Sequence, residues 1–376
     1  MAEILLFVGT RPEAVKAAPV ALALAGHPTL RPAIVHSGQH ADMVEQALSP
    51  FGLAPDEVVR LSRKTGGQAE LFAGLLPALD SVIARRSPSA VLVQGDTSTA
   101  LAGAMAAFWR GVPVVHLEAG LRTGDLTAPF PEEANRQLVA RIAALHLAPT
   151  QAAAAALHAE ALSGIVVTGN TVVDAALLTA SLDAPAVNPD LRAVEQAGGR
   201  LVLVTAHRRE SWGAPLDSVL SAVATLVEQH PDINVLLPVH PNPAVREQVS
   251  RALGRVPRVT LTSPLAYPDL IRVLRRAALV LTDSGGIQEE APSFGVPVLV
   301  LREVTERMEA VAAGCAWLVG TDRVQILVAA ERVLRERLRV PLHSNPFGDG
   351  LAAQRVVAAI ADLVTTRAAV ALSSAS

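Results

Sequence analysis

Carboxylates directly follow two apolar runs in the first half of the sequence. Asp96 comes after VLVQG, and Glu118 comes after VPVVHL. A third carboxylate, Glu132, stands at the predicted start of a helix in FPEEANR. Parallel α/β proteins place reactive groups beyond the carboxyl ends of their strands, and partly dehydrated carboxylates act as general acids and bases. The three residues therefore predict a proton-transfer site; the structural alternative is that Asp96 and Glu132 cap helices.

The stretch ALVLTDSGGIQEE predicts an anion site at a turn between a strand and a helix. The strand covers 278–281, and the turn that follows is Ser284-Gly285-Gly286. Glycines let backbone N–H groups approach a ligand closely, and the start of a helix favours a negative charge. Glu290 is placed to accept hydrogen bonds from ribose hydroxyls, which makes the stretch half of a nucleotide-diphosphate site. The alternative is an ordinary glycine-linked turn with solvated glutamates.

Positively charged groups follow two further predicted strands. GTRPEAVK carries Arg11 and Lys16, and TAHRRES carries His207 and Arg208. Charge-assisted hydrogen bonds to a phosphate or diphosphate are the natural use of such cations. The structural alternatives are an exposed arginine and lysine and a surface loop with a capping histidine. His240 in LLPVHPNP also ends a strand, where a lone histidine is more often structural.

The sequence lacks the short motifs that hold metals or redox cofactors. It contains no GxGxxG, HExxH or CxxC, so we expect no required metal and no cofactor. Cys315 is the single cysteine, which rules out a disulfide within the chain.

Apolar strand-like runs alternate with helical patterns, which predicts α/β domains with doubly wound parallel sheets. We expect strands at 4–8, 33–36, 90–93, 113–117, 145–148 and 165–168, and again at 201–205, 234–238, 258–261, 278–281, 297–301 and 316–318. Between the first six strands we expect helices at 12–25, 40–51, 68–86, 98–110, 132–144 and 150–162.

The alternation pauses at DAPAVNPDLRAVEQAGGR, residues 183–200, which predicts a domain boundary. We expect a Rossmann-like domain over 1–182 with the catalytic carboxylates and a nucleotide-binding one over 183–350. A C-terminal helix within 351–376 is expected to pack on the first domain. The two domains would face each other across a cleft, with ligands beyond the carboxyl ends of the strands.

The composition is typical of a compact globular enzyme. The 376 residues are 51% hydrophobic and 18% charged, with a formal net charge of −3. This balance leaves no basic footprint for a nucleic acid or an anionic membrane. The first residues, MAEILLFVG, are typical of a strand and carry no basic leader. We therefore expect no signal peptide and a cytoplasmic location.

Taken together, the motifs are similar to those of one family. The chain carries, in one order over nearly its whole length, GTRPEAVK, SGQH, HLEAGLRTGD, PFPEEANR, GNTVVDA, TAHRRES, PVHPNP and TDSGGIQEEAPSFGVPVLVLREVTER. It resembles the non-hydrolysing UDP-N-acetylglucosamine 2-epimerase family. The resemblance implies a glycosyltransferase-B-like fold, a UDP-sugar as the small-molecule partner, no cofactor and a homodimer. It also implies reversible conversion to UDP-N-acetylmannosamine, by UDP elimination to a 2-acetamidoglucal and re-addition, for cell-surface polysaccharide precursors.

The resemblance also implies roles for individual residues. Those at catalytic positions are Asp96, Glu118, Glu132 and His207, with Glu118 and Glu132 as the leading acid/base pair. Those at substrate-binding positions are Arg11, Lys16, Ser284, Gly285, Gly286, Glu290 and Arg307.

The chain departs from the family pattern near the expected uridine site. Met308 replaces the proline of a TERPEA motif, which is expected to loosen the loop that carries Arg307. Leu265 and Leu270 stand where some members have a glutamine and an aromatic residue near the uracil.

Some family members bind a second, activating UDP-sugar. Gln39, Arg208 and His240 stand at positions that resemble this allosteric site, although Asp42 replaces a frequent glutamine.

The remaining alternatives for the function are a hydrolysing epimerase that releases N-acetylmannosamine, a glycosyltransferase on the same fold and an inactive nucleotide-sugar sensor. The complete set of candidate acids argues against the sensor.

Overall fold

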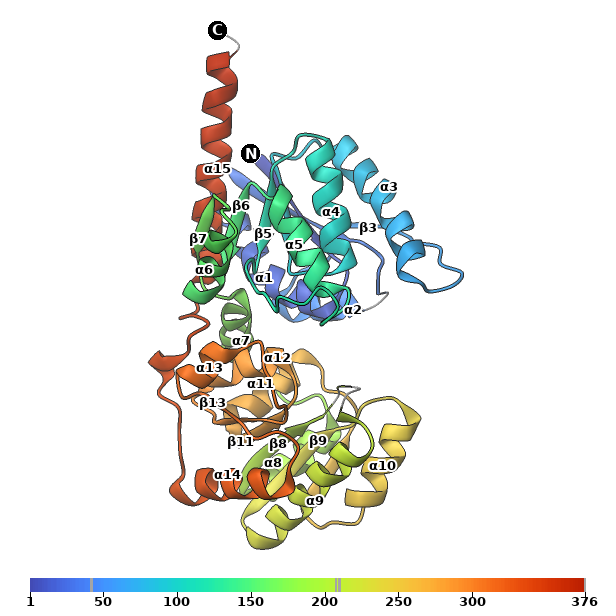
Figure 1. The fold of residues 1–376 in the computed structure, drawn as a ribbon, viewed down its shortest axis with the longest axis vertical. Helices are drawn as coiled ribbons and strands as arrows, with labels where there is room; N and C mark the ends of the chain where they lie inside the picture. The colour runs from blue at the N-terminus through green and yellow to red at the C-terminus, as the bar shows by residue number, and fades with distance from the viewer. Residues whose placement is uncertain (41–42, 207, 209–210, 375–376) are drawn as a thin grey trace. The chain divides into compact units, whose positions relative to one another are not determined.

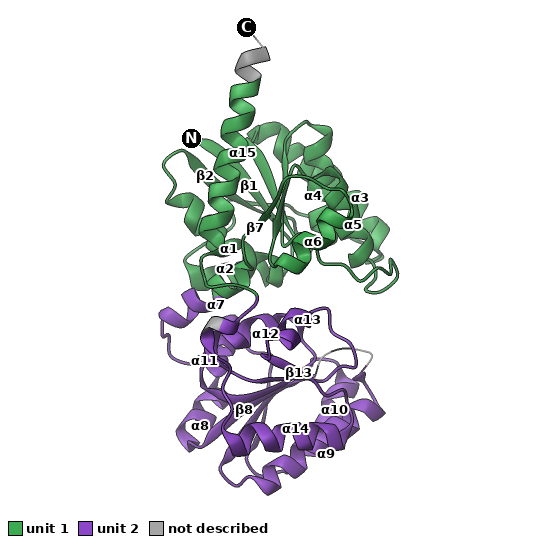
Figure 2. Cartoon of the chain, turned by 60° about the vertical axis from the view of Figure 1, so that its left-hand side comes forward, with its two compact units in different colours: residues 1–175, 347–376 green, residues 176–346 purple. Residues whose placement is uncertain are grey.

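The computed structural model describes residues 1–40, 43–206, 208 and 211–374. The chain forms two compact units (Figure 2). Unit 1 comprises residues 1–175 together with 347–376, and unit 2 comprises residues 176–346. The chain leaves unit 1 within helix α7 (Thr171–Ser181) and returns to it shortly before the C-terminal helix α15 (Ala352–Ser374).

Unit 1 is built on a seven-stranded sheet in the order β3-β2-β1-β4-β5-β6-β7, in which neighbouring strands pair in parallel. The strands are β1 (Ala2–Val8), β2 (Leu30–His36), β3 (Glu57–Val58), β4 (Ala90–Gln94), β5 (Val114–Leu117), β6 (Leu145–Ala148) and β7 (Ile165–Val167). Every residue of β4 and β5 is buried, as in sheets that helices cover on both faces. Gln94 pairs with Leu117, so Asp96 and Glu118 follow neighbouring strands at one edge of the sheet.

Helices connect these strands as the alternating pattern predicts. They are α1 (Arg11–Ala25), α2 (Met43–Leu48), α3 (Gln68–Arg86), α4 (Ser98–Trp109), α5 (Glu132–Ile142) and α6 (Gln151–Ala159). Helices α3, α4 and α5 pack side by side, while α1 contacts α2 and α15 (Figure 1). A short 3-10 helix, Ser49–Phe51, follows α2.

Unit 2 contains a six-stranded parallel sheet in the order β10-β9-β8-β11-β12-β13. Its strands are β8 (Arg200–Thr205), β9 (Ile233–Pro238), β10 (Val259–Thr262), β11 (Ala277–Thr282), β12 (Val298–Val300) and β13 (Ala316–Leu318). Its helices include α8 (Pro189–Ala197), α9 (Ala214–Gln229), α10 (Pro243–Leu253), α11 (Tyr267–Arg276), α12 (Gly285–Glu290), α13 (Met308–Ala312) and α14 (Arg323–Glu336).

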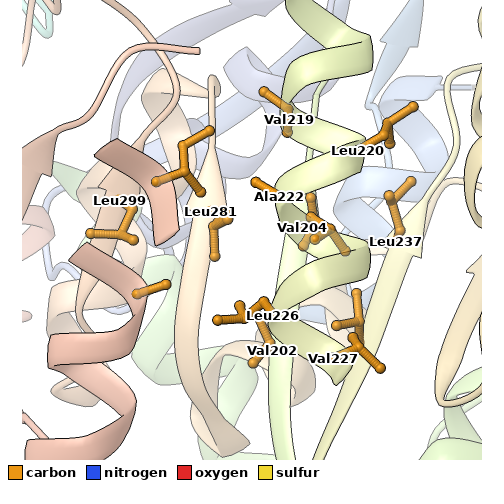
Figure 3. Close-up of a cluster of buried hydrophobic side chains, with 14 of the residues drawn as sticks. Val202, Val204, Val219, Leu220, Ala222, Leu226, Val227, Leu237, Leu281 and Leu299 are labelled. Carbon is orange, nitrogen blue, oxygen red and sulfur yellow. The ribbon is translucent and has the colours of Figure 1, made fainter. Parts of the chain in front are cut away.

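The core of unit 2 forms where α9 packs on the sheet (Figure 3). Val219 and Leu226 of α9 are buried together with Val202 and Val204 of β8 and Leu281 of β11. Each fully buried valine or leucine stabilises the fold by about 1.5–3 kcal/mol relative to an exposed one. This packing holds strands β8 and β11 in place. The Ser-Gly-Gly turn follows β11.

The predicted fold class is confirmed, since two doubly wound parallel α/β sheets are present. Residues 189–197, within the stretch 183–200, form helix α8, which was not predicted from the sequence. The Asn188 side chain accepts hydrogen bonds from the N–H groups of Asp190 and Leu191, and Pro189 begins the helix. The Asn-Pro pair therefore starts a helix. Strand β3, with two residues, is too short for a hydrophobic pattern to reveal.

A search of the described residues for a helix long and apolar enough to span a membrane finds none.

Candidate active site

The turn between β1 and α1 is held by a helix cap and a close backbone contact. Thr10 is the N-cap of α1, as its type predicts, and its hydroxyl accepts a hydrogen bond from the Glu13 N–H at 3.4 Å. A side chain at Gly9 would place its Cβ 2.2 Å from the Thr99 hydroxyl oxygen, which only glycine avoids. This turn carries Arg11, and the helix behind it carries Lys16.

Lys16 and Glu118 form a buried ion pair in unit 1. The Lys16 ammonium contacts Oε1 of Glu118, and the side chains are 10% and 13% exposed. The amide of Gln94 donates to Oε2 of the same carboxylate. The Asn170 amide donates to Oε1 at 3.5 Å. Three donors thus converge on the Glu118 carboxylate and hold it in one orientation.

The backbone of Glu118 is strained. Its φ of 62° lies in the left-handed region, which costs a non-glycine residue about 1–3 kcal/mol and is commonest at functional sites. The preceding strand fixes this geometry through His116, whose Nε2 lies 2.8 Å from the Gly95 carbonyl oxygen. Burial lowers the pKa of His116 to about 3, so the ring is neutral and Nε2 donates this hydrogen bond. The bond ties the turn before Asp96 to the strand before Glu118.

Asp96 is held by α5 and is not a helix cap. The Arg136 guanidinium donates to Oδ2 of Asp96, with Nε at 3.0 Å, and the Asn135 amide donates to its carbonyl oxygen at 2.8 Å. The N-cap of α4 is Thr97, whose hydroxyl accepts from the Ala100 N–H at 3.0 Å. The structural alternative for Asp96 was therefore wrong, and its carboxylate is free of a capping role.

Two adjacent glutamates at the start of α5 have different environments. Glu133 is fully buried and accepts from Arg136 at 3.2 Å and from the Thr123 N–H at 3.0 Å. Glu132 is half-buried, and its carboxylate makes no hydrogen bond or ion pair with the residues that the structure describes. Glu133 is thus structural, while Glu132 is available for chemistry.

Glu13 is a buried carboxyl group that the motif reasoning did not single out. Its side chain is fully buried, and it accepts hydrogen bonds from the Gly9 N–H at 3.0 Å and from the Thr97 hydroxyl at 2.6 Å. Burial raises its pKa to about 7, against the opposing effect of these hydrogen bonds. The carboxyl group links the turn that carries Arg11 to the turn that carries Asp96.

Glu13 makes the stability of unit 1 depend on pH. Because its folded pKa of about 7 exceeds the ordinary value of 4.5, the folded state binds more protons between these values. Its contribution to stability is therefore present below pH 4.5 and is lost as pH rises through 7. We expect Glu13→Gln to remove this slope, a change on the order of 3 kcal/mol between the two limits. Urea unfolding of wild type and variant at pH 5.5 and 8.5 measures the free energy of unfolding. The same pH dependence in both proteins would contradict a raised pKa of Glu13.

In unit 2, the Ser-Gly-Gly turn and Arg307 lie together. Ser284 is the N-cap of α12, and its N–H donates to the Thr282 hydroxyl at 2.9 Å. A Cβ on Gly285 would lie 3.0 Å from Cζ of Arg307, so the guanidinium lies directly against this glycine. Arg307 also donates to Glu289 at 2.9 Å and to Glu306 at 2.7 Å. A glycine turn with a fixed guanidinium beside it suits a diphosphate.

Gly285→Ala tests this arrangement. The added methyl group must displace the Arg307 guanidinium, and the loss of one charge-assisted hydrogen bond should weaken UDP binding about tenfold or more. Isothermal titration with UDP measures the change. Gly67→Ala is the matched control, because it places a methyl group before α3 of unit 1, where the nearest neighbour is the Thr65 hydroxyl at 3.6 Å. Equal UDP affinity of Gly285→Ala and wild type would rule out the contact as part of the site.

The remaining residues of the expected uridine site lie in unit 2. Glu290, the last residue of α12, is buried with 5% exposed. Leu265 is buried and Leu270 half-buried, next to the buried Tyr267 that the sequence reasoning passed over. Met308 begins α13 directly after Arg307 and is 52% exposed, so the missing proline does not prevent the helix.

The expected second-site residues belong to different units. In unit 1, Gln39 accepts from the Thr99 hydroxyl at 2.7 Å. In unit 2, the Arg208 N–H donates to the Asp283 carboxylate at 2.9 Å, and the His240 ring accepts from the Asn242 N–H at 3.1 Å. His207 and Asp42 lie outside the described residues.

Sequence reasoning missed the partners of the catalytic candidates. Gln94 lies at a strand end, Asn170 at a helix start and Arg136 on a helix, and each is at most 4% exposed. Only Gln94 carried a usable signal, since a polar residue that ends a wholly apolar strand next to a candidate acid is unusual.

Two Rossmann-like units, one with buried carboxylates beyond its strand ends and the other with a glycine turn before a helix, define a protein of the glycosyltransferase-B-like fold. A family model described as UDP-N-acetylglucosamine 2-epimerase matches residues 22–361. The UDP-N-acetylglucosamine 2-epimerase of Escherichia coli K12 is 43% identical over 376 residues, which cover 95% of this chain and 98% of the relative. The chain belongs to the UDP-N-acetylglucosamine 2-epimerase family, whose members are isomerases.

Solved structures agree with this assignment. The S. aureus MnaA co-structure with UDP superimposes with a TM-score of 0.87 at 40% identity, covering 97% of each chain. The UDP-GlcNAc 2-epimerase from Neisseria meningitidis bound to UDP-GlcNAc gives a TM-score of 0.86 at 36% identity, covering 96% of this chain and 100% of that one. The resemblance inferred from the motifs is therefore confirmed.

Proposed function

We propose that the chain interconverts UDP-N-acetylglucosamine and UDP-N-acetylmannosamine without hydrolysis, by elimination and re-addition of UDP. The observation that carries the proposal is the buried Glu118 carboxylate, which Lys16, Gln94 and Asn170 hold at the end of β5. A fixed, charged carboxylate suits removal of a proton from carbon. Family membership and the UDP-sugar complexes of relatives support the choice of substrate.

The proposed reaction begins with loss of UDP. The hydrogen on carbon 2 is not next to a carbonyl, so a carboxylate cannot remove it until the anomeric carbon becomes positive. The C1–O bond breaks, and its electron pair leaves on the β-phosphate oxygen of UDP. Ser284, Gly285, Gly286 and Arg307 would receive this charge, assisted by Arg11 and by His207. Glu290 would hold the ribose.

Proton transfer completes the first half of the reaction. A carboxylate of unit 1 takes the proton from carbon 2, a C1=C2 double bond forms, and the product is a 2-acetamidoglucal. Glu118 and Glu132 are the proposed acid/base pair, and Asp96 with its Arg136 partner is an electrostatic partner or shuttle. Return of a proton to the opposite face and re-addition of UDP give the epimer. No redox cofactor enters this sequence.

Incubation with UDP-N-acetylglucosamine in heavy water, followed by NMR, tests the proposal. We expect deuterium at carbon 2 and a second sugar that is still linked to UDP. Free N-acetylmannosamine with UDP would identify a hydrolysing epimerase instead. Turnover only when an acceptor is added, without exchange at carbon 2, would identify a transferase.

The proposal includes activation by a second UDP-sugar through Gln39, Arg208 and His240. Initial rates with pure UDP-N-acetylmannosamine, with and without a trace of the other epimer, test this part. Equal rates would remove it and leave the main reaction unaffected. We further propose that the enzyme acts as a cytoplasmic homodimer.

A further inference from the structure

The Asn170 side chain makes two hydrogen bonds in unit 1, each to a different partner. The residue is buried, with 3% exposed, and stands between β7 and α7. Its Oδ1 accepts a hydrogen bond from the Val172 N–H at 3.0 Å, at the start of α7. Its Nδ2 donates to Oε1 of Glu118 at 3.5 Å. One amide therefore supports a helix start and a candidate catalytic carboxylate.

The backbone of Asn170 binds the segment that returns to unit 1. Its N–H donates to the Phe347 carbonyl oxygen at 2.7 Å. Next to it, Gly169 has a φ of +89°, and a Cβ there would lie 3.4 Å from Cβ of Ala352. The outgoing and returning segments thus run in close contact at this point.

Asp174 strengthens the same junction four residues later. Its buried carboxylate accepts hydrogen bonds from the N–H groups of Ala352 at 3.2 Å and Ala353 at 2.8 Å, which begin α15. The chain leaves unit 1 after residue 175 and re-enters it at residue 347. Residues 170–174, which lead out of unit 1, are consequently hydrogen-bonded to the segment that returns to it.

We propose that Asn170 is a positioning residue for Glu118, which links that carboxylate to both chain connections of unit 1. The inference rests on the proposed acid/base role of Glu118. Lys16 supplies the positive charge to Oε1, and the neutral amide of Asn170 fixes the direction of the same oxygen without adding a second charge. Because Asn170 is also bonded to Phe347, a displacement of the connecting segments is transmitted to the reacting oxygen.

Asn170→Asp isolates the amide contact. The new side chain has the same shape and retains a carboxylate oxygen for the Val172 N–H, and aspartate caps helices as well as asparagine does. Only the donor to Glu118 is lost, and an acceptor replaces it. We expect kcat to fall about tenfold or more, while the Kd of UDP changes little, because Asn170 is not among the residues proposed to hold UDP. An unchanged kcat, or an equal loss in kcat and UDP affinity, would overturn the proposal.

Asn188→Asp is the matched control in unit 2. Asn188 caps α8 in the same way, and its Nδ2 donates to the Thr262 hydroxyl at 2.9 Å, which can reverse its direction and donate instead. We expect this variant to keep wild-type kcat. A kcat loss as large as that of Asn170→Asp would show a general effect of the amide-to-acid change and would overturn the specific role.

Thermal unfolding tests the contact between Asn170 and Glu118 independently of activity. In the wild-type background, we expect Asn170→Asp to lower Tm by about 2–4 °C, because two carboxylates then face each other. In a Glu118→Gln background, the same substitution should cost no stability. Equal Tm losses in both backgrounds would show that Asn170 and Glu118 do not interact. Failure of wild type to form any epimer would refute the proposed function, whereas this comparison would still decide whether the two side chains are coupled.

Discussion

Glu118→Gln should lower the rate of deuterium exchange at carbon 2 at least ~100-fold, as expected for loss of a general base. The glutamine can still accept a hydrogen bond, but it cannot take a proton from the sugar. Exchange and epimer formation are both followed by NMR in heavy water. Near-normal exchange would remove Glu118 from the mechanism, whatever the effect on stability.

The same substitution breaks the buried ion pair with Lys16. Removing one partner of such a pair commonly costs about 3–5 kcal/mol. The double variant Lys16→Met and Glu118→Gln replaces the pair by neutral groups, and we expect it to regain much of this stability while it remains inactive. Recovery of activity together with stability would show that the single variant lost turnover through misfolding.

Glu132→Gln should lower exchange by a similar factor, at least ~100-fold, with little loss of stability. The Glu132 carboxylate makes no bond to the described residues, so only its favourable charge at the start of α5 is lost, about 0.3–1 kcal/mol. Exchange rate and Tm are measured on the same preparation. A large Tm loss would contradict the environment that the structure gives this residue.

Glu133→Gln is the natural comparison, because it makes the same carboxylate-to-amide change at the neighbouring residue. Glu133 is fully buried and bonded to Arg136 and to the Thr123 N–H. We expect this variant to lose stability as well as activity, since Arg136 also holds Asp96. If Glu132→Gln retained full exchange, the proton donor to the second sugar face would have to be sought elsewhere.

The strand-end residues could be predicted from sequence because their positions follow from local patterns. An apolar run followed by a carboxylate locates Asp96 and Glu118, and a Ser-Gly-Gly turn before a helix locates the diphosphate candidate. These signals extend over a few residues, and the alternation of strands and helices places all of them at one kind of sheet edge.

The pairing of these residues could not be predicted in the same way. Lys16 and Glu118 are 102 residues apart, and they meet because β1, β4 and β5 are neighbours in the sheet. Gln94 and Asn170 are neutral amides with no charge pattern to reveal a carboxylate partner. Helix α8 was missed for a different reason, because Asn-Pro occurs both in linkers and at helix starts.

The return of the chain to unit 1 after residue 346 has a consequence for the order of folding during synthesis. Domains generally fold as units while the ribosome is still elongating the chain. Here α15, which packs on α1, is made after unit 2, so all of unit 2 is synthesised before unit 1 has its last helix. The part of α1 that α15 covers therefore stays uncovered until α15 is synthesised, and unit 2 is the first unit that can finish folding.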